Sequence, residues 1–142
     1  MKRNIILILA IAIFPFALQA QSDKKPKIEF ESLVYDMGVV ARYTSIVKCT
    51  FNFKNVGESD LYIHQIFTTC GCTKAEHNTE PVKPGESDKL TVTFDGRRSG
   101  EGRIRKRVNV YSNAEEEMTR LTIVGRILPQ QEKKVEIIEV EQ

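Results

Sequence analysis

The stretch of sequence that decides the fold is Val47-Lys48-Cys49-Thr50-Phe51-Asn52-Phe53-Lys54. Its apolar side chains occupy alternate positions, and the side chains between them are polar. This period of two predicts a β-strand with one buried face, because an amphipathic helix places apolar residues three or four positions apart. The same tendency recurs in four later groups: Leu61, Ile63 and Ile66; Leu90, Val92 and Phe94; Ile104, Val108 and Val110; Leu121, Ile123 and Ile127.

Turn-forming residues divide this pattern into short segments. Gly57 is free to take a positive φ after the first strand, and Pro84-Gly85 predicts a second turn. A slip in the phase of the alternation after Ile63 indicates a β-bulge. No stretch between Asp23 and Pro129 has a helical period. We therefore predict an all-β fold, an immunoglobulin-like antiparallel β-sandwich of about seven strands.

The first twenty residues have the three parts of a secretory signal peptide. Lys2 and Arg3 supply the positive charge, Ile5 to Leu18 is apolar apart from one proline, and Ala20 is a small residue suited to cleavage. The apolar run is shorter than the roughly 20 residues that span a bilayer. We expect residues 1–20 to be removed on export, with no stable membrane insertion afterwards. The protein is then periplasmic, extracellular or surface-associated.

The remaining chain divides into three parts. Residues 21–27 are polar and predict a flexible lead-in, residues 28–128 hold the sandwich domain, and residues 129–142 form a charged tail that is either an edge strand or disordered. The signal removes two basic residues, so the 21 basic residues of the whole chain fall to 19 and equal its 19 acidic residues. A neutral mature protein without interleaved aromatic residues is not expected to bind nucleic acid.

Three cysteines make the segment Thr69-Cys70-Gly71-Cys72-Thr73 the focal point of the sequence, and they leave the disulfide pairing open. A bond from Cys49 to either loop cysteine would staple neighbouring strands and close a loop of about 20 residues, worth roughly 3 kcal/mol. This staple is the simplest interpretation. A bond between Cys70 and Cys72 requires Gly71 to bend the backbone, because extended residues two apart have Cα atoms roughly 6.5–7 Å apart. Without a bond, Cys49 is a small buried hydrophobic residue.

A soft metal ion is the alternative to a disulfide. Two thiolates, from Cys70 and Cys72, could converge on Cu(I), which accepts few ligands. Zn would need further ligands, and His77 or Cys49 are the candidates, since His64 is expected to face outward. Thiol-redox chemistry is a further alternative, with Lys74 lowering a thiol pKa, but it usually uses a Cys-x-x-Cys spacing at a helix N-terminus.

Arginines concentrate on one predicted strand. Arg103, Arg105 and Arg107 share its outward face, and Arg126 is expected alongside on the next strand. Such a row could meet an anionic polysaccharide or an acidic partner. The more common role of a charged row is a solvated sheet face that also discourages aggregation.

The sequence contains few of the residue patterns that conventional catalysis requires. It has two histidines and no Gly-x-Ser-x-Gly elbow for a hydrolase triad. No phosphate-binding glycine loop is present in the sequence. We predict a non-enzymatic protein with no catalytic residues and no cofactor unless the cysteines hold a metal ion.

A set of motifs spans nearly all of the predicted domain: Phe51-x-Phe53-x-Asn55-x-Gly57, Leu61-x-Ile63, Cys70-Gly71-Cys72-Thr73, Pro81-x-x-Pro84-Gly85 and Val110-x-Ser112-Asn113. Together they resemble an exported bacterial family catalogued as domain of unknown function 1573, from about Ile28 to Ile127. The resemblance implies an immunoglobulin-like sandwich related to the major sperm protein and to pilus chaperones. It implies no activity, and Cys49 departs from the family pattern.

The sequence thus predicts an exported, non-enzymatic binding or assembly module of the cell envelope, with the Cys70-Gly71-Cys72 loop as its focal site. Its expected partner is a protein or another component of the envelope. The alternative is a protein that binds a soft metal ion, or performs thiol-redox chemistry, through Cys70 and Cys72.

Overall fold

The computed structural model of the protein describes residues 24–42 and 46–129. The predicted signal peptide 1–20, residues 21–23 of the lead-in and nearly all of the charged tail lie outside these residues. The elements are β1 (Ile28–Phe30), β2 (Val34–Ala41), β3 (Ile46–Asn55), β4 (Ile63–Thr68), β5 (Thr73–His77), β6 (Ser87–Asp95), the short 3-10 helix η1 (Gly96–Arg98), β7 (Gly102–Ser112) and β8 (Met118–Leu128). No helix among the described residues is long and apolar enough to cross a membrane.

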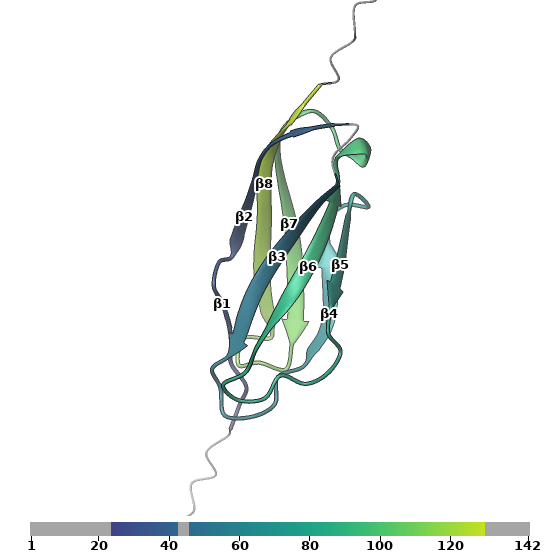
Figure 1. The fold of residues 1–142 in the computed structure, drawn as a ribbon. Helices are drawn as coiled ribbons and strands as arrows, with labels where there is room; N and C mark the ends of the chain where they lie inside the picture. Colours follow the sequence, from purple (N-terminus) through teal and green to yellow (C-terminus); the bar gives the residue numbers. More distant parts are fainter. Residues whose placement is uncertain (1–23, 43–45, 130–142) are drawn as a thin grey trace, which may run out of the picture.

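The strands form two four-stranded sheets that pack face to face, in the orders β1-β3-β6-β5 and β2-β8-β7-β4 (Figure 1). This confirms the predicted all-β sandwich, with eight described strands where about seven were expected. One detail of the prediction is wrong, because β2 pairs with β8 in parallel. The chain passes from the first sheet to the second between β1 and β2, so one N-terminal stretch supplies an edge strand to each sheet. Alternation shows which face of a strand is buried, but it does not identify the neighbouring strand.

The alternation in β3 places its apolar side chains in the core as predicted. Cys49, Phe51 and Phe53 are buried, whereas the polar residues between them are exposed. β3 pairs antiparallel with β6, in a register that sets Cys49 opposite Val92 and Phe51 opposite Leu90. The second sheet covers this layer with the buried residues Val108, Val110, Leu121 and Ile123. Burial of these side chains is the main stabilising contribution to the sandwich.

Two glycines of the predicted turns serve different purposes. Gly85 has a φ of 83°, a conformation that favours glycine, as the Pro84-Gly85 signal suggests. Gly57 does not have a positive φ, so that prediction was wrong. A Cβ at Gly57 would instead collide with the backbone of residues 25–27. Close approach of two chain segments, and not turn geometry, requires glycine at this position.

The Asn55 side chain is a fully buried hydrogen-bonding centre. Its Nδ2 donates to the carbonyl oxygens of Ser59 and Val82, both at 2.8 Å. Its Oδ1 accepts hydrogen bonds from the backbone N–H groups of Lys27, at 3.3 Å, and Gly57, at 3.0 Å. One side chain therefore joins the lead-in, the turn after β3 and the segment before β6. This explains the Asn55-x-Gly57 motif as a structural feature.

Asn113 plays a similar role at the end of β7. Its Oδ1 accepts a hydrogen bond from Tyr62 N–H at 2.7 Å, and its Nδ2 donates to the Asp60 carbonyl at 2.9 Å. The predicted irregularity after Ile63 is also present, as a register shift between Ile63 and Gln65 in β4. These motif residues stabilise the loops at one end of the sandwich.

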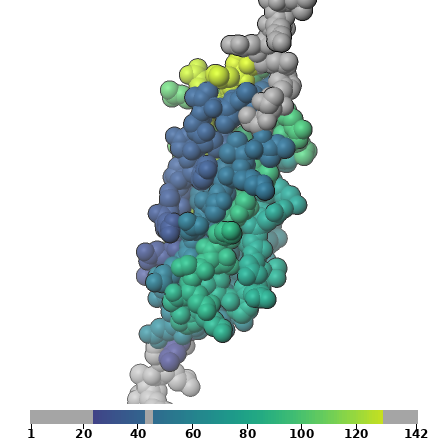
Figure 2. Space-filling view, in the orientation of Figure 1, coloured from purple at the N-terminus to yellow at the C-terminus, as the bar shows by residue number. Residues whose placement is uncertain are grey.

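The described chain begins at one end of an elongated body and finishes at the other (Figure 1). Figure 2 shows the molecule from the side on which β3 and β6 form most of the surface. The second sheet lies behind this surface, and its outer face is turned away from the viewer.

Candidate functional site

The Cys-Gly-Cys loop connects the two sheets along one side of the sandwich. It follows β4, which is an edge strand of the second sheet, and precedes β5, which is an edge strand of the first. The loop therefore crosses between two sheet edges, and it lies at the rim of both.

The structure joins Cys70 to Cys72 by a disulfide with a Cα–Cα distance of 5.2 Å. This separation falls within the usual range for a disulfide, because the backbone turns at Gly71. Thr73 fixes the turn, since both its backbone N–H and its Oγ1 donate to the Cys70 carbonyl, at 3.2 and 3.0 Å. Of the pairings that the sequence left open, the structure has the small ring.

Cys49 is not part of any staple. Its thiol is free and completely buried on the inner face of β3. Burial raises the pKa of this thiol from 9.0 to about 11, because the thiolate would lose its hydration. Cys49 thus behaves as a small core residue, and the favoured interpretation of the sequence, a staple from Cys49 to the loop, is wrong.

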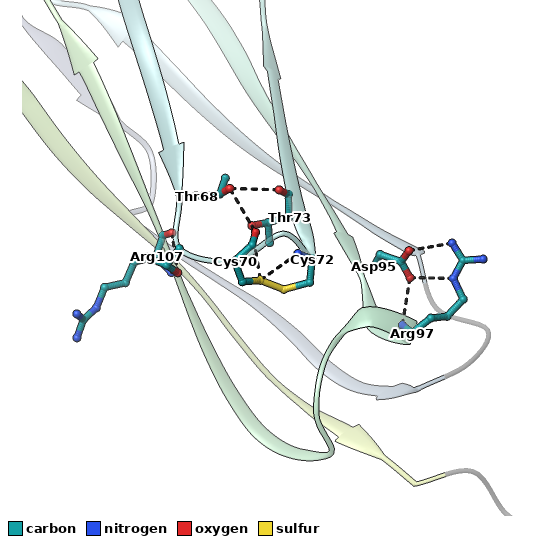
Figure 3. The surroundings of a disulfide bond; sticks show 8 residues. Thr68, Cys70, Cys72, Thr73, Asp95, Arg97 and Arg107 are labelled. Carbon is teal, nitrogen blue, oxygen red and sulfur yellow. Dashed lines mark hydrogen bonds and ion pairs between the residues drawn. A yellow bond between two sulfur atoms is a disulfide. The ribbon is translucent and has the colours of Figure 1, made fainter.

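Hydrogen bonds tie the loop to both sheets (Figure 3). Thr69 donates from its backbone N–H to the Arg107 carbonyl of β7 at 3.2 Å. The Asp95 N–H of β6 donates to the Cys72 carbonyl at 2.8 Å. Thr68 Oγ1 donates to the Thr73 carbonyl across the ring at 3.2 Å. The loop is therefore anchored on the second sheet before the ring and on the first sheet after it.

The two sulfur-bearing residues differ in their surroundings. Cys72 is only 5% exposed and packs in a small apolar cluster with Phe94 and Ile127. Cys70 is half-buried at the edge of this cluster. An external thiolate would reach Cys70 first, and it would then have to expel the Cys72 thiolate into apolar surroundings. Burial raises a thiol pKa and makes it a poor leaving group, so this geometry disfavours rapid exchange.

The structure does not gather further metal ligands around the ring. His77 lies at the far end of β5, about 15 Å along the strand from Cys72 at the usual rise per residue. His64 is exposed on β4. Within residues 24–42 and 46–129, no group of three or more His, Cys, Asp or Glu side chains could hold a metal ion. The nearby Lys74 donates to Glu76 at 2.8 Å on the surface of β5.

An ion pair supports the turn next to the loop. Arg97 donates from Nε and Nη2 to the two carboxylate oxygens of Asp95, at 2.9 and 2.8 Å. The hydrogen bonds from Arg97 hold the pKa of Asp95 below its usual value. Figure 3 shows this pair beside the ring, whereas the Arg107 side chain points away from it.

The four arginines singled out in the sequence lie together on the outer face of the sheet β2-β8-β7-β4. Arg103, Arg105 and Arg107 are exposed on β7, and Arg126 of β8 is the cross-strand neighbour of Arg103. Among the described residues, none of these four side chains forms an ion pair. We call this outer face the arginine face.

Sequence reasoning missed the apolar part of the arginine face. Large exposed hydrophobic side chains lie among and beside the arginines: Val34 and Val39 of β2, Phe67 of β4, Tyr111 of β7, and Met118 and Leu128 of β8. Phe67 and Tyr111 form an edge-to-face pair with ring centroids 5.8 Å apart. Only the strand register brings these residues together, because they come from four separate segments.

A family model described as a protein of unknown function (DUF1573) matches residues 28–127. The chain belongs to this family. The match confirms the resemblance inferred from the Cys-Gly-Cys-Thr core and its flanking motifs. No curated protein matches the chain.

Solved structures with this fold come from distant proteins. A protein of unknown function from Porphyromonas gingivalis W83 is 21% identical with a TM-score of 0.65, and the match covers 78% of this chain and 51% of that one. The chain therefore spans about half of that protein's length. A PapD-like domain of human CEP192 is 12% identical with a TM-score of 0.61, covering 85% and 99%. The periplasmic chaperone SfaE is 10% identical with a TM-score of 0.52, covering 72% and 58%. At these identities the similarity shows the fold alone.

Proposed function

We propose that the protein is an exported, non-enzymatic binding or assembly module of the cell envelope. Its docking surface is the arginine face, and the Cys70-Gly71-Cys72 loop stabilises the rim of that surface. The observation that carries this proposal is the contrast between the outer faces of the two sheets.

The outer face of the first sheet is mostly polar, with Ile46 at the start of β3 as an exposed apolar residue. Its exposed strand residues include Lys48, Thr50 and Asn52 on β3, together with Lys89 on β6. On the arginine face, by contrast, Val39 is 63% exposed and Phe67 is 50% exposed. Single exposed hydrophobic residues are ordinary, but six on one sheet face form a patch of the kind that marks interaction sites. Protein interfaces are enriched in arginine, methionine and aromatic residues and depleted in lysine, which matches this contrast.

The ring contributes stability in this account and performs no chemistry. Thr69, directly before the ring, donates from N–H to the Arg107 carbonyl and so fixes the edge of the arginine face. The burial of Cys72 makes its thiolate a poor leaving group, which favours a lasting bond over exchange. A soft-metal site would need both sulfurs as free thiolates, and the disulfide removes both.

The fold neighbours support a binding role by analogy. YadV and SfaE are chaperones, and SfaE is a periplasmic one. The sequence of residues 1–20 indicates export, which accords with such a setting. The two described ends of the chain lie at opposite poles of the sandwich (Figure 1).

Site-specific photo-crosslinking in the producing cell tests the proposal. A photoreactive residue is placed at Phe67 or Val39 on the arginine face, and at Thr50 or Lys89 on the other sheet as matched exposed controls. The proposal predicts one adduct of the same mass from both positions on the arginine face and none from the controls. Equal adducts from both sheets, or none from either, would show that the arginine face is not a docking surface.

A further inference from the structure

The arginines form a regular row, and none of them is ion-paired within residues 24–42 and 46–129. Arg103, Arg105 and Arg107 are two residues apart on β7, so their side chains repeat about every 7 Å along the strand. Arg126 extends the row sideways, because it lies directly across from Arg103. Like charges opposite each other destabilise a sheet, and within the described part of the chain none of the four arginines forms an ion pair, although Asp36 lies in the same region of the face. An anion from outside would relieve this repulsion.

A hollow of about 630 Å³ lies within the row. Arg103, Arg105 and Arg126 line it together with the acidic residue Asp36 and the apolar residues Val39 and Val124, so cations outnumber the one carboxylate three to one. A charged group and an apolar group could therefore be bound side by side in this hollow.

Two glycines shape the hollow. Gly38 has a φ of 66° at the register shift of β2, and Asp36 Oδ1 accepts a hydrogen bond from its N–H at 2.8 Å. Gly125 of β8 faces this bulge so closely that a Cβ would lie 3.0 Å from the Gly38 carbonyl oxygen. The backbone irregularity of β2, packed closely against Gly125, therefore contributes to the depression.

We propose that the arginine face binds an extended acidic segment of a partner protein, with carboxylates at alternate residues and an apolar side chain among them. This inference rests on the proposed function and names the chemistry of the partner. An extended peptide repeats every second side chain at the same spacing of about 7 Å as the arginine row. Arginine binds carboxylates with two parallel hydrogen bonds, which adds specificity. An anionic polysaccharide could match the charges, but it has no apolar side chain to contact Val39 and Val124.

Titration of the full chain with defined probes tests this inference. The probe is a capped peptide of about ten residues with glutamate at alternate positions and one central valine on the glutamate side. Its comparison probes are the same peptide with glutamine for glutamate, and an oligogalacturonate of similar charge. We expect the glutamate peptide to bind most tightly, with an affinity that falls as salt concentration rises.

Two triple variants distinguish binding at the arginine face from a general effect of the protein's net charge. Arg103→Gln/Arg105→Gln/Arg126→Gln should weaken binding of the glutamate peptide about tenfold or more. The matched control removes three exposed cations from the opposite sheet, namely Lys48, Lys54 and Lys89, each replaced by glutamine. It should change the affinity by less than about twofold. All six side chains are exposed, so circular dichroism and thermal unfolding should show that both variants remain folded.

Three results would overturn the inference: equal weakening by both triple variants, equal binding of the glutamine peptide, or tighter binding of the oligogalacturonate. The crosslinking experiment shows whether only the inference of an acidic partner fails or whether the proposed docking function fails as well. If the adduct at Phe67 forms unchanged in the arginine variant, the docking surface stands and the acidic partner does not. If Phe67 yields no adduct in the wild-type chain, the proposed function itself fails.

Discussion

The small disulfide ring makes a stability contribution that can be predicted from its size. The bond between Cys70 and Cys72 closes a loop of only three residues. In the chain-entropy model, a loop of this size contributes about 1.6 kcal/mol, which is roughly half the contribution of a staple from Cys49. Reduction of the wild-type chain should therefore lower the free energy of unfolding by about 1.6 kcal/mol and leave the fold intact.

Substitution of both loop cysteines by serine should cost more than reduction. Cys72 is buried against Phe94 and Ile127, so the Cys72→Ser hydroxyl would lie in an apolar cluster. Burying a hydroxyl without a hydrogen-bond partner adds about 1–2 kcal/mol. The double variant Cys70→Ser/Cys72→Ser is expected to lose about 3 kcal/mol in total.

Urea unfolding followed by circular dichroism measures both quantities, with and without a reducing agent. The slope of the free energy against urea concentration should change little, because a ring of three residues hardly alters the surface exposed on unfolding. The adduct formed from Phe67 in the photo-crosslinking experiment should persist in the folded double variant.

Two outcomes would refute this reasoning. Unchanged stability on reduction would show that the ring does not constrain the unfolded chain. Loss of the Phe67 adduct from a variant that remains folded would show that the loop takes part in docking and does more than add stability. An intact mass with a stoichiometric metal adduct would identify the metal-binding alternative.

Three further predictions concern the fold that presents the site. Asn55→Ala should lower the free energy of unfolding by about 4 kcal/mol, because four hydrogen bonds are lost at a buried position. The control Asn52→Ala removes one hydrogen bond at an exposed position and should cost less than about 1 kcal/mol. Chemical denaturation compares the two variants. Between pH 9 and 11 the free energy of unfolding of the wild-type chain should fall by about 2 kcal/mol more than that of Cys49→Ala. The sign follows because the folded-state pKa of Cys49 is raised to about 11, so the unfolded chain loses this proton first as pH rises. Gly57→Ala should lower the melting temperature by several degrees, since its Cβ would collide with neighbouring backbone, whereas Gly100→Ala, with open space around it, should change it little; calorimetry measures both.

The sequence predicts the sandwich well because its strands are half-buried. In β3, the exposed and buried residues follow the alternation of apolar and polar side chains from Lys48 to Phe53. The parallel pairing of β2 with β8 was not predictable in the same way. The alternation of buried and exposed residues in β2 is the same whether its neighbouring strand runs parallel or antiparallel. The role of Gly57 was also hidden, since the segment that approaches it lies some thirty residues earlier in the chain.

The candidate site was predictable only in part. The row of Arg103, Arg105 and Arg107 follows directly from a period of two, so its common face could be inferred from one strand. Val39 and Phe67 join that face only through the register of β2 and β4, which the sequence does not specify. The pairing of Cys70 with Cys72 depends on the turn at Gly71, and residue spacing alone cannot distinguish it from a strand staple.

Hydroxyl-radical footprinting tests most directly the claim that the arginine face is a docking surface. Phe67, Tyr111 and Met118 are oxidisable side chains exposed on this face, and Tyr62, at 42% exposure, lies outside the strands and serves as an internal reference. The measurement compares the purified protein with the protein labelled in its native envelope. We predict that the three residues on the arginine face are protected in the envelope while Tyr62 remains reactive. Equal oxidation of all four residues in both states would contradict the account.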